Sequence, residues 1–302
     1  GELPRAVELL RTSISLNSDY FPARQRLAEL AERLEDWPLA VEQRRWLADH
    51  RPSTAATLAL AEALHNNGNS TYADAEQELL EVINDPSLTE SQRVPALTAL
   101  GRLYYTIGNI DSAHEILTRA QNAAPENPNV AYELGRVLVA RGQSSAAAEQ
   151  FRLAIEKDPQ PVRAYLELAN FYKEQANNAL LEGTDTAAST STATQQRQQR
   201  LQRYIENINA ATNQYRAAYR VGASDATSLR QIGEHLMAVG DYEGAAQAYM
   251  RLTERNTEDR AGYERLAQAY IPLARYEQAQ AAARRAIDLG NGYTPTASVT
   301  LG

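Results

Sequence analysis

The sequence predicts an all-α protein built as a linear array of helix pairs. Alanines recur along the 302-residue chain at intervals of 34 or 35 residues, with two longer intervals of 38 and 64 residues. A fixed period of this size indicates a repeated supersecondary unit. The composition, rich in Ala, Leu, Arg, Glu and Gln and only 7% aromatic, favours helices. The recurring alanines are Ala6, Ala40, Ala75, Ala113, Ala147, Ala211, Ala245 and Ala279.

Residues 128–161 give the clearest copy of the unit. Its apolar and small residues recur three and four positions apart, which places them on one face of each predicted helix. Gly142 follows the first helix and supplies a left-handed stop, and Pro159 prevents continuation of the second helix. The markers of this unit are Leu134, Gly135, Gly142, Ala147, Phe151, Ala154 and Pro159.

The same markers recur at the same spacing in other stretches of the chain, and the pattern resembles the tetratricopeptide repeat family over nearly its whole length. The resemblance implies an all-α, right-handed superhelical solenoid of antiparallel helix pairs. It also implies a protein-interaction scaffold and not an enzyme. The matching markers include Leu100, Gly101, Tyr104, Gly108, Ala113, Leu117, Ala120 and Pro125 in one unit, and Leu229, Ile232, Gly233, Leu236, Gly240, Ala245, Tyr249 and Leu252 in another.

The register of these markers divides the chain into successive units. We expect a single array over residues 1–302 that begins with a second helix and stops within a further unit. We therefore infer a fragment of a longer array. The expected units are a half repeat at 1–20, repeats at about 21–53, 54–93, 94–127, 128–161, 162–225, 226–259 and 260–293, and the start of another at 294–302.

The longest interval between alanines predicts an inserted helical hairpin at about 175–205. A helix is expected to continue to about Glu182, and another to run from near Gln195 to about Arg220. The stretch between them, 183–194, is rich in Gly, Ser and Thr and predicts a mobile loop. The hairpin should project from the array.

Three arginines on the returning limb of the hairpin are spaced three residues apart and share one helical face. We interpret Arg197, Arg200 and Arg203 as a docking tip for an acidic partner or a phosphate group. The alternative interpretation is a solvated face on an extended hairpin.

A second basic stripe follows the first helix of successive units, at positions spaced by three and four residues. The family resemblance implies that this stripe lines the concave face, and the register turns Tyr105 and Tyr132 away from the core. Arginine forks beside an amide suit carboxylates, so we predict a groove for a peptide or partner protein with acidic groups. The alternative is a solvated wall with local ion pairs. The predicted groove residues are Arg102, Tyr105, Tyr132, Arg136, Arg163, Asn170, Lys173 and Arg230.

The composition excludes several classes of site. A chain without cysteine forms no disulfides or thiolate metal sites. A net charge of −8 argues against general affinity for nucleic acid or an anionic membrane. The four histidines are isolated, and the sequence predicts no catalytic residue, metal site or cofactor. No apolar run approaches the roughly 18 residues of a spanning helix, no signal peptide opens the chain, and no compartment is predicted.

Two further roles stay open beside the scaffold. The chain can be the repeat arm of a larger enzyme or membrane assembly, of the glycosyltransferase or polysaccharide export and secretion type, where it positions a substrate or a neighbouring domain. It can also associate with itself, because the open ends of repeat arrays expose apolar faces.

Overall fold

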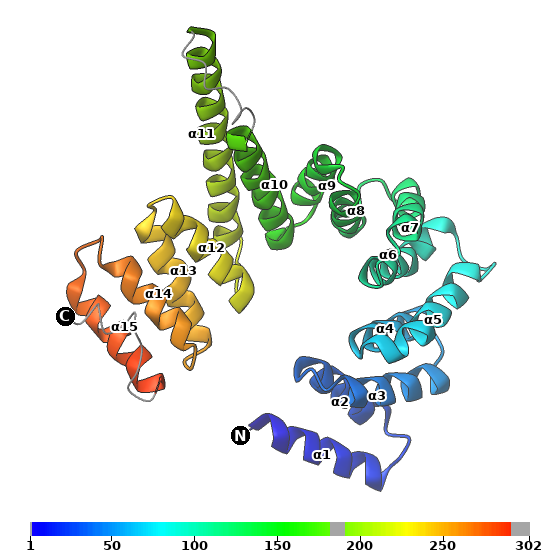
Figure 1. Cartoon of the computed structure of the whole chain (residues 1–302). Helices are drawn as coiled ribbons and strands as arrows, with labels where there is room; N and C mark the ends of the chain where they lie inside the picture. The colour runs from blue at the N-terminus through cyan, green and yellow to red at the C-terminus, as the bar shows by residue number, and fades with distance from the viewer. Residues whose placement is uncertain (1, 182–190, 291–302) are drawn as a thin grey trace. The chain divides into compact units, whose positions relative to one another are not determined.

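The computed structural model describes residues 2–181 and 191–290 of the chain. These residues form fifteen α-helices and one short 3-10 helix, η1, and contain no strand (Figure 1). The prediction of an all-α solenoid of antiparallel helix pairs is confirmed. Most of the predicted hairpin loop, 183–190, and the predicted start of a further repeat at 294–302 lie outside the described residues.

The helices fall into two compact units, divided between Gln150 and Phe151. In the first unit, the long helices pack as successive neighbours along the chain. Its helices are α1 (Glu2–Leu16), α2 (Phe21–Arg33), α3 (Trp37–His50), α4 (Thr54–Asn66), η1 (Asn69–Thr71), α5 (Tyr72–Asn84), α6 (Glu90–Thr106), α7 (Ile110–Ala123), α8 (Pro128–Ala140) and the first half of α9 (Ser144–Lys157).

The second unit follows the same order of helix pairs. The pairs α10 with α11, α12 with α13 and α14 with α15 each lie side by side. Besides the end of α9, its helices are α10 (Val162–Leu181), α11 (Ser191–Arg220), α12 (Ala226–Ala238), α13 (Tyr242–Arg255), α14 (Arg260–Tyr270) and α15 (Tyr276–Leu289).

Small residues allow the paired helices to approach closely. Seven of the eight recurring alanines are at most 2% exposed, whereas Ala6 on α1 is half-buried. A Cβ atom at Gly101 would lie 2.4 Å from Cγ of Leu117 on the paired helix. A Cβ atom at Gly233 would likewise lie 2.6 Å from Cζ of Tyr249. A larger side chain at either glycine would therefore overpack the crossing.

The turn within each pair repeats one backbone conformation. Gly108, Gly142 and Gly240 occupy the same register position, five residues before the recurring alanine, and have φ angles of 81°, 72° and 79°. Glycine adopts this left-handed conformation without a Cβ clash. Glu35 and Ala274 hold the equivalent position in two other pairs with φ angles of 57° and 56°. The turn geometry is thus kept even where the sequence lacks glycine.

Polar side chains begin the second helices that follow these turns. Asp36, Asn109 and Asp241 each accept a hydrogen bond from the backbone N–H three residues later. This contact satisfies one of the unpaired N–H groups at a helix start. The sequence therefore encodes each of these helix starts locally.

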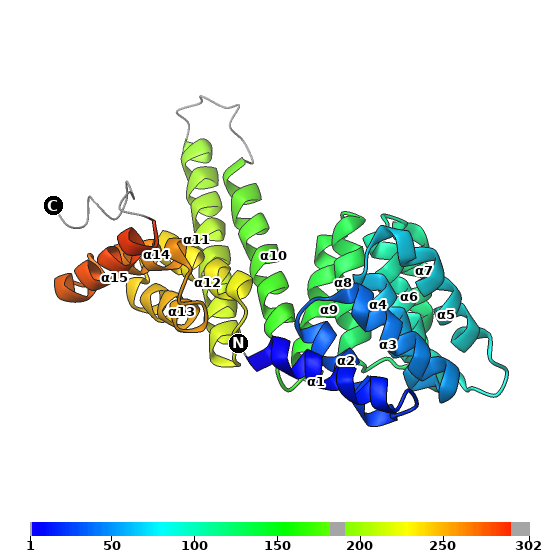
Figure 2. The same ribbon diagram turned by 90° about the horizontal axis from the view of Figure 1, so that it is seen from below.

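The α10–α11 hairpin is longer than the neighbouring pair (Figure 2). Helix α10 has 20 residues and α11 has 30, whereas α12 has 13. Helix α11 begins at Ser191, so the predicted loop was wrong for residues 191–194, which are helical. Ser and Thr have only moderately lower helix propensity than Gln, and the helix extends through them.

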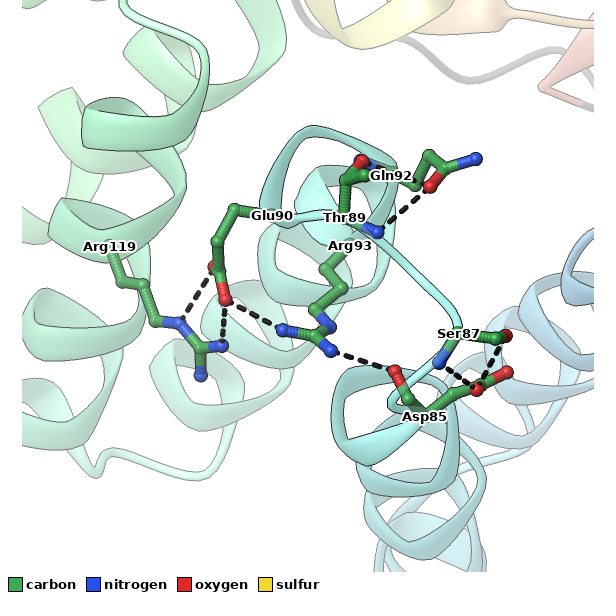
Figure 3. A network of polar contacts seen from close by, with 7 residues as sticks. All are labelled: Asp85, Ser87, Thr89, Glu90, Gln92, Arg93 and Arg119. Carbon is green, nitrogen blue, oxygen red and sulfur yellow. Dashed lines mark hydrogen bonds and ion pairs between the residues drawn. The ribbon is translucent and has the colours of Figure 1, made fainter.

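Between α5 and α6, a polar network fixes the loop that joins two helix pairs. Glu90 accepts hydrogen bonds from Arg93 and from Arg119 on α7, and these two guanidinium groups lower the pKa of the Glu90 carboxyl. Arg93 also donates to the backbone carbonyl of Asp85 at 2.7 Å. Figure 3 shows the complete network of Asp85, Ser87, Thr89, Glu90, Gln92, Arg93 and Arg119. It joins the end of α5 to α6 and α7.

Candidate functional site

The structure brings the predicted groove residues of the first unit together on successive first helices. Arg136 on α8 lies with its Cζ atom 4.3 Å from the ring centroid of Tyr105 on α6. The ring of Tyr132, also on α8, lies 5.9 Å from the same Cζ atom. Tyr132 is only 9% exposed, so the expectation that it turns away from the core was wrong.

A buried carboxylate holds Arg136 in place. Nη1 of Arg136 donates to Oε2 of Glu133 at 2.8 Å, and Glu133 is only 5% exposed. A buried carboxylate requires a charged partner, because leaving it unpaired costs several kcal/mol. This ion pair and the contact with Tyr105 fix the guanidinium group before any ligand arrives.

Arg102, on α6, has a looser set of contacts. Its Nη2 atom lies 3.3 Å from Oε1 of Glu62 on α4, and both side chains are partly exposed. Its Nε atom is buried and has no hydrogen-bond partner among the described residues.

His65 on α4 lies close enough to Arg102 and Arg136 for both of their charges to affect it. Burial lowers the pKa of His65, and the positive charges of Arg102 and Arg136 lower it further, against the opposing effect of Glu62. The Nε2 atom of His65 also lies 3.2 Å from the hydroxyl of Thr106. Three successive first helices, α4, α6 and α8, thus present cationic and aromatic groups at one site.

The predicted groove residues of the second unit lie in separate groups. Oδ1 of Asn170 accepts hydrogen bonds from the hydroxyl of Tyr215 at 3.0 Å and from Nε2 of Gln231 at 2.8 Å. The Nζ atom of Lys173 lies 5.9 Å from the Tyr215 ring centroid. Arg230 instead pairs with Asp259 at 2.7 Å. Asn170 and Lys173 therefore share one site around Tyr215, which does not include Arg230.

Arg163 and the three hairpin arginines lie on α10 and α11. Arg163, Arg197 and Arg203 are exposed, whereas Arg200 is half-buried. The three hairpin arginines are therefore not equally available to a partner.

Sequence reasoning missed a buried polar group at the base of the hairpin. His235 on α12 is only 5% exposed, and its ring lies 4.4 Å from that of Tyr215. The hydroxyl of Thr212 donates to the carbonyl of Ile208, so it accepts from Nε2 of His235 at 2.9 Å. Burial, followed by the charge of Lys173, lowers the pKa of His235 to about 4. The repeat register places His235 on the buried face of a first helix, and this position was the signal in the sequence that could have identified it.

The described residues contain no group of three or more His, Asp or Glu side chains that could hold a metal ion. The arrangement is suited to non-covalent binding through cation, amide and aromatic contacts.

None of the helices within 2–181 and 191–290 combines the length and the apolar character needed to cross a membrane.

Comparisons with known proteins agree with the repeat pattern. Two family models described as tetratricopeptide repeat match residues 98–172 and 261–289. Human tetratricopeptide repeat protein 21A is 23% identical over 280 residues, a match that covers 90% of this chain and 20% of that protein. The chain therefore spans about a fifth of the length of this curated relative.

Solved structures of repeat proteins resemble the fold. The C-terminal part of a TPR repeat-containing protein from Cytophaga hutchinsonii has a TM-score of 0.50 at 16% identity, with 77% of this chain and 78% of that chain covered. YrrB, described as a TPR protein with an unusual peptide-binding site, has a TM-score of 0.47 at 14% identity, with 74% of this chain and 97% of that chain covered. With its helix pairs and the two matching family models, the chain contains tetratricopeptide repeats and is similar to proteins of that family.

Proposed function

We propose that this chain is a non-catalytic protein-interaction scaffold whose inner face holds a peptide segment with acidic groups. The repeat fold supports the general role of a protein-interaction scaffold. The binding of an acidic peptide is the more specific part of the proposal. The site is formed by His65, Arg102, Tyr105 and Arg136 in the first unit, and we call it the inner-face site.

The observation that carries the proposal is the unequal pairing of its two arginines. Arg136 is fixed by buried Glu133, whereas Arg102 has a long, partly exposed contact with Glu62. Exposed ion pairs contribute only about 0–1 kcal/mol. A ligand carboxylate can therefore replace Glu62 at Arg102 at low cost, while Arg136 and Tyr105 supply a preformed cationic and aromatic surface.

The competing interpretation is a solvated wall with local ion pairs, and three of the predicted groove cations do have acidic partners. The pairs differ in burial, however. Glu133 and Asp259 are buried, so their pairs serve the fold, whereas Glu62 is largely exposed. Arg102 is thus the cation that a partner can recruit.

Neutral substitution tests the proposal without leaving a buried charge. The variant Glu133→Gln/Arg136→Gln/Arg102→Gln removes both cations together with the buried carboxylate. A matched variant, Arg26→Gln/Arg45→Gln, removes two exposed cations elsewhere in the first unit. Proteins retained from the native extract are quantified by mass spectrometry, and circular dichroism checks the helix content of each variant.

We expect the wild type and the matched variant to retain the same partner protein in equal amounts. Recovery of that partner on the triple variant should be at least tenfold lower. Recovery should also fall as salt is raised, because the contacts are charged. Equal recovery on all three proteins would remove the inner-face site from the proposal.

The role as an arm of a larger enzyme or assembly stays a prediction. The human relative is about five times as long as the part that this chain matches, so repeats of this kind do occur within longer proteins. Self-association is the third role, and α1 offers a surface for it, with Leu9 exposed and Ala6 only half-buried. Light scattering over a concentration series, with Leu9→Glu as the variant, tests that role separately.

A further inference from the structure

An apolar stripe on the α10–α11 hairpin is not covered by any described helix. Leu201 and Ile205 on α11 are 52% and 43% exposed, and Leu180 on α10 is 51% exposed. Exposed apolar residues that gather on one face indicate an interaction surface. We call these three residues the hairpin stripe.

The face of α11 that carries Leu201 and Ile205 is covered by α12 at its other end. Ile205, Ile208 and Thr212 follow at spacings of three and four residues, which keeps them on one helical face. Thr212 contacts His235 of α12 at 2.9 Å. This face of α11 is therefore packed against α12 near Thr212 and continues, without that cover, toward Leu201.

The length of α12 explains where the cover stops. Tyr215 contacts Gln231, and Thr212 contacts His235, so α12 runs toward the tip of the hairpin. It ends at Ala238, three residues or about 4.5 Å beyond His235. Leu201 is eleven residues from Thr212, or about 16 Å along α11. The stripe therefore extends about two turns past the end of α12. In Figure 1 the ribbon of α11 extends beyond that of α12.

Leu180 faces the same side from α10. It follows Lys173 by seven residues, two helical turns, so both side chains point in nearly the same direction. Lys173 lies against the ring of Tyr215, next to His235 of α12. Leu180 on α10 therefore lies on the same side of the hairpin as Leu201 and Ile205 on α11.

The charge around the stripe is positive. Between residues 194 and 210, α11 carries three arginines, Arg197, Arg200 and Arg203, and a single acidic residue, Glu206. Arg197 is exposed and lies one turn from Leu201 on the same face. A partner that covers the stripe with its apolar side would meet these arginines with its flanks.

From this geometry we propose that the hairpin stripe binds an amphipathic helix of a partner protein, with acidic residues flanking its apolar face. An amphipathic helix that docks on an apolar surface buries its residues at i, i+3, i+4 and i+7. The uncovered part of the stripe, about 12 Å, corresponds to about 8 residues of such a helix. This surface shares no residue with the inner-face site, so the two proposals are tested by different variants.

A synthetic peptide tests the proposal directly. The probe is a fluorescein-labelled helical peptide of 14 residues with leucines on one face and glutamates on both flanks, and a scrambled peptide of the same composition is the control. Fluorescence anisotropy measures binding to the wild type and to Leu201→Gln/Ile205→Gln, in which helix propensity is retained. Arg197→Glu tests the charge. Matched controls are Met250→Gln, an exposed apolar residue on α13, and Arg220→Glu, an exposed arginine at the other end of α11.

We expect saturable binding of the amphipathic peptide that Leu201→Gln/Ile205→Gln weakens at least tenfold and Arg197→Glu at least threefold, with both controls unchanged. Equal binding of the scrambled peptide, or no effect of the stripe variants, would overturn the proposal. A wild-type dimer that becomes monomeric in Leu201→Gln/Ile205→Gln would also overturn it, because the stripe would then pair two copies of this chain.

Discussion

At the scale of single residues, two tyrosines at the same register position have different surroundings. The hydroxyl of Tyr215 donates to Asn170 and accepts from Gln231, whereas the hydroxyl of Tyr249 is buried and has no partner among the described residues. Removing a hydroxyl that forms hydrogen bonds leaves its partners unsatisfied, but removing an unpaired hydroxyl does not. Comparing Tyr215 with Tyr249 therefore separates two contributions to stability, that of the hydroxyl hydrogen bonds and that of ring packing.

We expect Tyr215→Phe to lower the free energy of unfolding by about 1 kcal/mol, and Tyr249→Phe to leave it unchanged or raise it slightly. Urea unfolding followed by circular dichroism measures both variants. An equal loss in the two variants would show that the Asn170 network contributes nothing to stability.

The burial of His235 makes stability depend on pH. Burial and Lys173 lower the pKa of His235 to about 4 in the folded chain, while an unfolded histidine has a pKa near 6.5. Between these values the unfolded chain binds a proton that the folded chain does not, so the free energy of unfolding falls as the pH is lowered from about 6.5 toward 4. The slope from this one group is at most about 1.4 kcal/mol per pH unit.

The variant His235→Gln keeps an N–H donor for Thr212 but does not titrate. We expect the difference in unfolding free energy between wild type and variant to be constant above pH 7. Below pH 6 the wild type should lose stability relative to the variant, because only the wild type has His235 to protonate. Urea unfolding at a series of pH values gives this difference, in which the other titrating groups cancel. A difference that is independent of pH would contradict the buried neutral state of His235.

Single residues of the inner-face site also show which features could be predicted from the sequence and which could not. The repeat register placed Arg102, Tyr105 and Arg136 near one another, because it fixes which positions of successive first helices share a face. It could not show that Glu133 is buried beneath Arg136 or that Tyr132 is covered, since both depend on packing between helices. His235 was overlooked because a lone histidine carries no motif.

At the scale of helices and turns, most of the structure follows from local sequence. The glycine of the turn, the Asp or Asn that begins the second helix and the small residue at the crossing each act within one unit. The start of α11 was predicted less well, because Ser and Thr are common both in loops and at helix starts. The α6 start at Glu90 depends on a capping box between Thr89 and Gln92, a signal that the repeat register does not contain.

The turn provides a prediction at this scale. Ala274 has a φ angle of 56° at the position where Gly240 has 79°. An L-residue in this conformation is strained, whereas glycine is not. We expect Ala274→Gly to raise the free energy of unfolding by about 0.5–1 kcal/mol and Gly240→Ala to lower it by about 1 kcal/mol. Thermal and urea unfolding check both, and effects of the same sign in the two variants would contradict the shared turn geometry.

At the scale of the whole molecule, stability should be distributed along the chain. In a repeat array each helix pair contacts only its neighbours, so the total is approximately a sum of unit and interface contributions. The described residues form two compact units, each with its own buried cluster, such as that around Leu97 in the first and that around Tyr249 in the second. Damage to one cluster should therefore leave distant helices folded.

Overpacking a single helix crossing tests this distribution. At Gly101 an added Cβ atom would lie 2.4 Å from Cγ of Leu117, so Gly101→Val should separate α6 from α7 and destabilise the first unit. Hydrogen exchange monitored by mass spectrometry should show faster exchange in α6, α7 and their neighbours, at rates at least tenfold above wild type. Helices α12–α15 should keep their wild-type protection, because they belong to the other compact unit, which has its own buried cluster. Faster exchange of equal size in both units would instead mean that the chain unfolds as one cooperative body, and the nearest-neighbour description would not hold for this protein.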